Sequence, residues 1–350
     1  MVLKNRFVRT ATAERMASPN GGFTQEMVNL YKRLARGGAG LIITGHSYIH
    51  PLGKADRRMT GIHKDGLIPA LKKLVNEVHK LKTKIVMQIN HCGGMRDKDV
   101  GEETPIGPST IGYKPRGITS REMGPEEIEE VIDLFAQASR RVKNAGFDGV
   151  EIHSVHGYLI NQFLSPLTNK REDSWGGSLD NRMRFLLEVY SRIRKTVGKD
   201  YPVLAKIPAG DFIEGGLTVN EACEVAKKLS ELGIDGIELS GGLAGSRYRK
   251  GKKDLGWMRK EAYFRPYSEM VKKVTRVPII LVGGLRKPET MRKILEEGAA
   301  DLIGLSRTLI REPDLPNRIR RGDLRKAECV SCSNCSGPSG REPTKCRAKK

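Results

Sequence analysis

Short apolar runs rich in valine, isoleucine and leucine alternate along the chain with longer segments whose apolar residues recur at helical spacing. This alternation is typical of parallel strands joined by crossover helices. Eight strands are predicted, near Phe7–Ala11, Gly40–Thr44, Lys84–Ile89, Gly149–His153, Val203–Ile207, Gly236–Ser240, Ile279–Val282 and Leu302–Leu305.

A weak internal repeat connects predicted helices to predicted strands. The stretch Gly146–His153 recurs as Gly233–Ser240 and, more weakly, as Gly298–Gly304. In the first copy, a helix beginning at Pro125 would end at Gly146, because proline suits a first helical turn and glycine suits a C-terminal cap. Eight such units favour a closed (β/α)8 TIM barrel over an open doubly wound sheet, since no GxGxxG motif follows the first strand.

Three long segments follow predicted strands, at residues 93–124, 156–179 and 241–260. Barrel enzymes carry their chemistry at the carboxyl ends of the strands, so these loops are expected to cover an active site. We expect the barrel to occupy residues 1–322 and a cysteine-rich tail to occupy residues 323–350.

The 62 Lys and Arg residues outnumber the 41 Asp and Glu residues, leaving a net charge of +21. Such an excess attracts anions, including phosphorylated cofactors. It is spread along the chain without interleaved aromatic residues, so nucleic acid is not an expected partner. No apolar leader or run of about 18 apolar residues is present, which predicts a cytoplasmic protein outside the membrane.

Four of the six cysteines crowd into the tail, as Cys329, Cys332, Cys335 and Cys346. Without a secretion signal, this set indicates a metal or cluster site before disulfides. The first three have the C-x2-C-x2-C spacing of ferredoxins, while four thiolates also suit tetrahedral zinc.

Two histidines and a tyrosine leave the fourth predicted strand together, as His153, His156 and Tyr158. Imidazoles three residues apart can converge on one carbonyl oxygen, and a phenol can protonate an enolate-like carbon. The trio suits conjugate reduction. The alternatives are hydrogen bonds within the loop or a metal held by the histidines.

Glycines and an arginine follow the last two predicted strands. Gly283 and Gly284 would let backbone N–H groups approach a phosphate, and Ser306 and Arg307 begin a helix whose dipole and charge favour an anion. Barrels commonly build a phosphate site from these two loops, so the sequence predicts a phosphorylated cofactor.

The segment from Gly146 to Leu187, with HSVHGYLINQFLSPLTNKRED and WGGSLDNRMRF, resembles the signature stretch of the old yellow enzyme, or NADH:flavin oxidoreductase, family. LKNRFVRTATAE near the start and QINHCGG after residue 87 extend the resemblance over nearly the whole barrel. The resemblance implies FMN as cofactor, NADH or NADPH as reductant, and reduction of an activated carbon–carbon double bond.

The resemblance also implies roles for individual residues. Gln88 resembles the amide that binds the pyrimidine edge of the flavin, and Lys206 stands where many relatives carry an arginine near flavin N1. Ala13 departs from the hydroxyl or thiol that relatives often place beside the flavin, so Thr12 is a candidate substitute. The expected cofactor-binding residues are Thr10, Ala11, Thr12, Gly45, Gln88, Lys206, Gly283, Gly284, Ser306 and Arg307.

For the substrate, the resemblance implies that His153 and His156 hold a carbonyl oxygen while Tyr158 protonates the α-carbon. The expected substrate is a small enone or an enoyl or dienoyl compound, with a CoA ester as one candidate. Family members suggest a homo-oligomer.

The tail is similar to the [4Fe-4S] segment of 2,4-dienoyl-CoA reductases, which continue into further flavin- and nucleotide-binding domains. We therefore expect a [4Fe-4S] cluster, with zinc as the alternative. Electrons are expected from a separate donor protein or directly from NAD(P)H.

Two other functions stay open. A non-redox phosphate-binding barrel enzyme, an aldolase or isomerase, could use Lys206 as a Schiff base. A basic nucleic-acid-binding or regulatory protein could be built on an inactive barrel.

Overall fold

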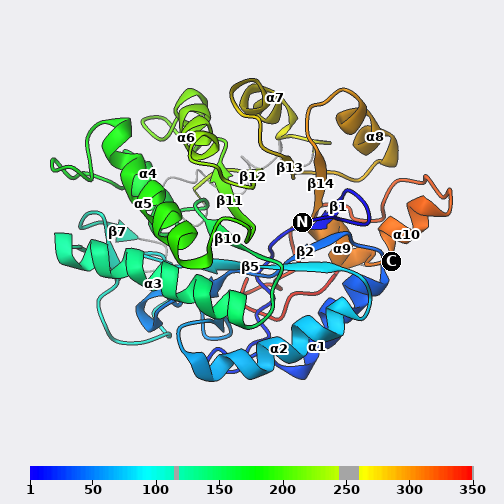
Figure 1. Ribbon diagram of the computed structural model, residues 1–350, viewed down its shortest axis with the longest axis horizontal. Coiled ribbons are helices and arrows are strands. Elements are labelled where there is room, and N and C mark those ends of the chain that lie inside the picture. The colour runs from blue at the N-terminus through cyan, green and yellow to red at the C-terminus, as the bar shows by residue number, and fades with distance from the viewer. Residues whose placement is uncertain (114–117, 244–259, 349–350) are drawn as a thin grey trace.

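A ring of eight parallel strands lies at the centre of the molecule in the computed structural model, which describes residues 1–113, 118–243 and 260–348 (Figure 1). β14 pairs with β1, where Phe7 lies opposite Ile303 and Arg9 opposite Leu305, so the ring is closed. The predicted (β/α)8 barrel is confirmed. The ring consists of β1 (Phe7–Arg9), β2 (Leu41–Ile43), β5 (Lys84–Asn90), β10 (Gly149–His153), β11 (Val203–Pro208), β12 (Gly236–Ser240), β13 (Ile279–Leu281) and β14 (Leu302–Leu305).

Helices surround the ring (Figure 1). Several begin at a hydroxyl residue that accepts a backbone N–H, as Thr24, Ser178 and Thr218 do. The helices are α1 (Gln25–Arg36), α2 (Ile68–His79), α3 (Pro125–Asn144), α4 (Leu159–Leu164), α5 (Leu179–Val197), α6 (Val219–Glu231), α7 (Arg265–Val274), α8 (Pro288–Glu296), α9 (Arg307–Arg311) and α10 (Leu315–Arg320). Within the described ranges, no helix has both the length and the apolar character that a membrane span requires.

Short elements that the sequence pattern did not predict decorate the loops. Two-residue strands carry no usable periodicity, which explains why they were missed. Of the long predicted loops, the one after β12 lies largely outside the described residues. The additional elements are β3 (Ser47–Tyr48), β4 (Thr60–Gly61), β6 (Ile106–Gly107), β7 (Gly112–Tyr113), β8 (Ile118–Thr119), β9 (Arg121–Glu122) and the 3-10 turns η1 (Pro51–Gly53) and η2 (Asp65–Leu67).

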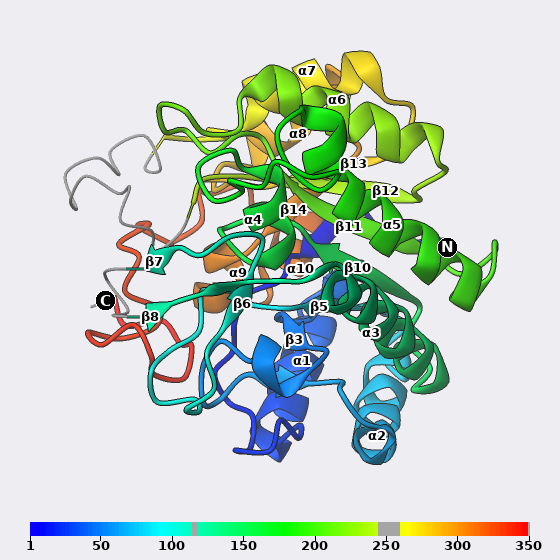
Figure 2. The same cartoon turned by 90° about the vertical axis from the view of Figure 1, so that its left-hand side faces the viewer.

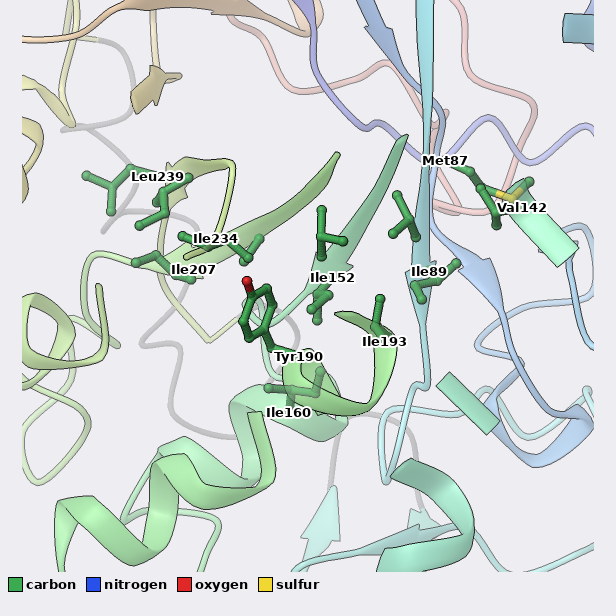
Figure 3. Close-up of a cluster of buried hydrophobic side chains, with 14 of the residues drawn as sticks. Met87, Ile89, Val142, Ile152, Ile160, Tyr190, Ile193, Ile207, Ile234 and Leu239 are labelled. Atoms are coloured by element: carbon green, nitrogen blue, oxygen red, sulfur yellow. The ribbon is translucent and has the colours of Figure 1, made fainter. Parts of the chain in front are cut away.

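The main apolar core fills the space between the ring and the helices. Figure 3 shows side chains of the strands, such as Ile152, meeting Tyr190 and Ile193 of α5. Close by, Phe163 of α4 stacks on Phe185 of α5 with ring centroids 4.2 Å apart. This packing holds α4, and the loop that precedes it, against the end of β10.

The inside of the ring changes from apolar to polar along the strands. A separate buried cluster fills the part of the ring nearer the amino ends of the strands. It is formed by Val8, Leu41, Ile43, Val86, Leu204 and Ile280. Because side chains alternate along a strand, the next inward positions on β5, β10, β11 and β12 lie two residues further on. They carry polar groups: Gln88, Glu151, Lys206 and Glu238.

The internal repeat corresponds to a repeated corner. Each copy begins with a left-handed glycine, at φ +87° for Gly146, +86° for Gly233 and +68° for Gly298. An aspartate follows, and its carboxylate accepts the backbone N–H that begins the neighbouring strand. The three bonds join Asp148 to Ile85 at 2.9 Å, Asp235 to Val203 at 2.8 Å and Asp301 to Ile279 at 2.7 Å.

The tail folds back onto the barrel, and Figure 2 shows it in red on the same side of the molecule as β7 and β8. The Ala327 N–H donates to the carbonyl of Arg286 at 2.8 Å. Further on, Thr344 bonds the loop after β1, because its N–H donates to the Glu14 carbonyl and its hydroxyl donates to the Ala13 carbonyl at 2.6 Å. The tail therefore packs on the loops that leave the strands.

The corner at Asp148 generates a prediction about stability. Burial alone would raise the pKa of Asp148, but hydrogen bonds from Lys84, the Ile85 amide and His79 outweigh it and lower the pKa. A lowered carboxyl pKa stabilises the fold above the unfolded value, and that stability is lost as the pH falls through the folded value. We expect Asp148→Asn to cost about 1–3 kcal/mol at neutral pH, and less below about pH 4, where the unfolded aspartate is protonated.

Denaturant unfolding at several pH values measures this cost. The matched control is Asp133→Asn, which removes a half-exposed partner of Arg192 and is expected to cost under about 1 kcal/mol. An equal loss for Asp148→Asn at neutral and acid pH would show that its charge does not contribute.

Candidate active site

Two cavities adjoin at the carboxyl end of the ring, with volumes of about 320 and 180 Å³. They form one elongated hollow, because five residues line both of them: Ala11, His156, Lys206, Ser240 and Tyr263. This is the end of the barrel at which the sequence predicted the chemistry.

Four aromatic rings gather along the larger cavity. The predicted His153, His156 and Tyr158 come together, since the ring centroid of His153 lies 5.4 Å from that of His156 and 5.1 Å from that of Tyr158. His46, which follows β2, joins them with its centroid 5.0 Å from Tyr158. The structure therefore adds a third imidazole to the predicted trio.

His156 takes a backbone conformation that few residues with side chains adopt. Its φ is +66°, and Gly157 follows at +79°, so the chain turns sharply as it leaves β10. The turn places His156 Nε2 2.9 Å from Ser240 Oγ at the end of β12. The turn after β10 thereby directs the His156 ring toward the end of β12.

His153 lies 3% exposed at the end of β10. Its burial, with further contributions from His156, His46 and Lys206, holds its pKa well below the usual range. Nδ1 of His153 has no hydrogen-bond partner among the described residues. The ring is therefore a neutral imidazole, which offers one N–H donor and one acceptor.

The polar residues inside the ring form the floor of the hollow. Gln88 Nε2 donates to Glu151 Oε2 at 2.6 Å, and Lys206 Nζ lies 2.6 Å from Glu238 Oε1. Gln88 and Lys206 line the larger cavity. The amide and the ammonium can thus face a ligand in the hollow while a buried carboxyl holds each from below.

The smaller cavity lies at the ends of β13 and β14. Gly283 and Gly284 have φ of +104° and +71°, and a Cβ atom at Gly283 would come within 2.7 Å of the Tyr263 ring. Arg307 lines this cavity and donates to Ser333 Oγ of the tail at 3.0 Å. Because α9 is only five residues long, the glycine amides and the Arg307 charge, rather than a helix dipole, would attract an anion.

The loop after β1 runs along both cavities. Thr10 and Ala11 line the smaller cavity, Ala11 and Thr12 line the larger one, and Thr12 Oγ1 lies 2.8 Å from Ser306 Oγ. Gly45 is outside both linings. Its N–H donates to Glu14 Oε1 at 2.7 Å, and a Cβ at this position would meet the other oxygen of Glu14 at 2.1 Å. Gly45 thus supports the loop from behind.

The four tail thiols interact electrostatically. Burial raises the pKa of Cys335, and charges on Cys329, Cys332 and Cys346 raise it further. Among the residues that the structure describes, however, no three His, Cys, Asp or Glu side chains are arranged to hold a metal ion. The donor set matches a thiolate cluster in chemistry but is not assembled as one.

Comparison with known proteins decides the family. The model of the NADH:flavin oxidoreductase / NADH oxidase family matches residues 1–325. The chain belongs to this family. Membership confirms the resemblance to this family, and it supports FMN and a nicotinamide as cofactors.

Several relatives in this family are much longer than this chain. The chain is 38% identical to the NADH oxidase of Thermoanaerobacter brockii, covering 96% of this chain and 52% of the relative. It is 32% identical to the cinnamate reductase of Clostridium sporogenes, covering 96% and 54%. A structure of 2-naphthoyl-CoA reductase with 2-naphthoyl-CoA superposes with a TM-score of 0.89 at 31% identity, covering 96% and 52%. The chain thus spans about half the length of each.

The described residues fit an FMN molecule. An elongated hollow suits a flat ring joined to a phosphate, and two left-handed glycines line one end of it, where backbone N–H groups can approach a phosphate. At the other end, the buried amide of Gln88 and the ammonium of Lys206 match the polar edge of a flavin.

Sequence reasoning missed six residues that line the larger cavity: His46, Ser240, Gly241, Gly242, Tyr263 and Phe264. His46 and Ser240 could have been found, because each ends or follows a predicted strand. Tyr263 and Phe264 precede α7, far from any predicted strand end. Cys329 and Ser331 of the tail also line the smaller cavity, which no local pattern indicated.

The lowered pKa of His153 leads to a direct test. We expect its ring signals in NMR spectra to stay those of a neutral imidazole from pH 8 down to about pH 5, where an ordinary histidine with a pKa near 6.5 would have titrated. The variant His153→Asn identifies the signals. Titration of this ring near pH 6.5 would show that solvent reaches it and that it can donate from both nitrogens.

Proposed function

We propose that this protein is an FMN-dependent ene-reductase, which reduces the double bond of an α,β-unsaturated carbonyl, enoyl or dienoyl compound. The observation that carries the proposal is the hollow itself. Two histidines and a tyrosine converge on one part of it, and a glycine pair with an arginine lies at the other end. When bound, FMN would accept hydride from NADH or NADPH and deliver it from N5 to the β-carbon.

The chain's own residues would orient the cofactor. Gly283, Gly284, Ser306 and Arg307 would bind the phosphate through backbone amides and a guanidinium. The backbone of Thr10, Ala11 and Thr12 would lie along the ring, with Gly45 supporting that loop. Gln88 would bind the pyrimidine edge, and Lys206 would stabilise negative charge near N1.

The substrate would be held by its carbonyl oxygen. His153 and His156 would donate hydrogen bonds to it, which stabilises the negative charge that develops as the β-carbon is reduced. Tyr158 would give its phenolic proton to the α-carbon. Two relatives support this class of substrate by name, a cinnamate reductase and a 2-naphthoyl-CoA reductase. The second also favours a CoA ester, a polyanion that the positive net charge would attract.

A Schiff-base aldolase or isomerase is disfavoured by the environment of Lys206. A nucleophilic amine must lose its proton. Lys206 instead lies 2.6 Å from Glu238, and such a pair stabilises the ammonium. The same pair is compatible with a cation that serves a flavin.

For the tail, we propose a [4Fe-4S] cluster ligated by Cys329, Cys332, Cys335 and Cys346 in a segment, residues 323–350, distinct from the FMN-binding barrel of residues 1–322. The ferredoxin-like spacing of the first three cysteines supports it, as does the presence of four thiols in one short segment. A separate electron-donor protein would deliver electrons through this segment, unless NAD(P)H reduces FMN directly. A homo-oligomer remains our expectation.

The proton donor can be tested with Tyr158→Phe. We expect the variant to keep FMN absorbance and reduction by NAD(P)H, while transfer to an enone slows by about 10²-fold or more because a general acid is lost. Stopped-flow spectra separate the two half-reactions. Tyr267→Phe on α7 is the control and should leave both rates unchanged. Wild-type protein that binds no flavin even when FMN is added would overturn the proposed function.

The cluster can be tested by metal analysis of protein purified without oxygen. We expect iron and sulfide at about four each per chain, a large loss of both in Cys332→Ser, and no loss in Cys223→Ser, whose cysteine lies on α6 away from the tail. Zinc in place of iron would leave the proposed function of the barrel unchanged, but it would show that the tail is a zinc site and not an iron–sulfur cluster.

A further inference from the structure

Two glutamates lie inside the ring directly below the proposed flavin site. Glu151 and Glu238 are both 0% exposed, and they come from β10 and β12 on either side of Lys206 on β11. The two glutamates also contact each other through a side-chain hydrogen bond. Apart from that bond and the ion pair with Lys206, the oxygens of Glu238 and Oε1 of Glu151 have no hydrogen-bond partner among the described residues. The contacts that hold them are the ion pair of Glu238 with Lys206 and the hydrogen bond from Gln88 to Glu151.

The charges do not balance if both glutamates are ionised. Two buried carboxylates would face a single ammonium, and like charges in a space without water cannot both stay ionised. Burial and the neighbouring Glu238 raise the pKa of Glu151 well above its usual range, although Lys206 and Gln88 oppose the shift. A proton held between the two carboxyls would relieve this repulsion.

The other titratable groups around the pair do not change this balance. Arg9 of β1 acts on Glu238 through space, but Glu14 is its principal acidic partner. His153 is held neutral. Tyr263, which precedes α7 and lines both cavities together with Lys206, has its pKa raised by burial and stays a phenol.

We propose that Glu151 and Glu238 share one proton beneath the cofactor and bind a second proton when the cofactor gains negative charge above Lys206. The proposal rests on the proposed FMN site. The glutamates are positioning residues, because they act through Gln88 and Lys206 and line neither cavity.

The balance of the step is simple. A hydride donor supplies two electrons and one proton to the cofactor, which becomes negatively charged. Solvent supplies one further proton, which the two glutamates bind together, so that neither carboxyl carries a charge. Lys206 then no longer shares its charge with Glu238, and it can pair fully with the reduced cofactor.

Glu151 also fixes the orientation of the Gln88 amide. One N–H of the amide is directed at Glu151, at 2.6 Å, which leaves the other N–H and the carbonyl oxygen for a ligand. A glutamine at position 151 can still accept this bond, so Glu151→Gln removes the shared proton without removing the contact.

The shared proton can be tested without flavin. We expect the infrared spectrum of flavin-free wild-type protein at pH 7 to contain a protonated carboxylic acid band that shifts in D₂O. Difference spectra should show that band lost in Glu151→Gln and equally in Glu238→Gln, because the remaining glutamate then ionises beside Lys206. Glu296→Gln, on exposed α8, is the control and should retain it. A band that persists in both buried variants would overturn the shared proton.

The second proton can be tested in the FMN-loaded protein by reductive titration with dithionite at several pH values. We expect the midpoint potential of the wild type to fall by about 30 mV more per pH unit than that of Glu238→Gln, which corresponds to one additional proton per two electrons. Equal slopes would overturn proton uptake by the pair. Absence of bound flavin would overturn the proposed function and this uptake together, while the infrared measurement would still decide whether the glutamates share a proton.

Discussion

Closure of the ring between β14 and β1 is the constraint on which the rest of the molecule depends. Because all eight ring strands are parallel, closure brings their carboxyl ends to a single rim. Residues as distant in sequence as Thr12 and Ser306 can then lie within hydrogen-bond distance. The hollow is a product of this convergence, since the loops after β1, β10, β12, β13 and β14 all contribute to its walls.

The interior of the ring combines an apolar part with a buried polar part. Its lower part is filled with aliphatic side chains, as stability alone would favour. Nearer the carboxyl ends, β5, β10, β11 and β12 carry an amide, an ammonium and two carboxyls inside the ring, all nearly inaccessible to water. Replacing a buried ion pair with apolar residues is often neutral or stabilising, so the fold does not need this pair for its stability.

Periodicity along the chain predicted the strands of the ring and the residues at the strand ends. The eight ring strands, the helix of residues 125–144 and the grouping of His153, His156 and Tyr158 all follow from periodicity and from the rule that strand ends share one rim. The Glu151 and Glu238 pair could not be predicted, because spacing along the chain does not show which side chains meet across a ring. The place of Cys329 beside Gly283 depends on how the tail returns, and no periodic signal encodes that path.

The bond between Thr344 and Ala13 joins residues 331 positions apart. During synthesis, the loop after β1 is made long before Thr344, and it lacks this partner while all the other strands of the ring are being made. Contacts of such long range slow folding and prolong exposure of unfinished surfaces. A chaperone that protects the first strands of the ring would therefore have to remain bound until the tail docks.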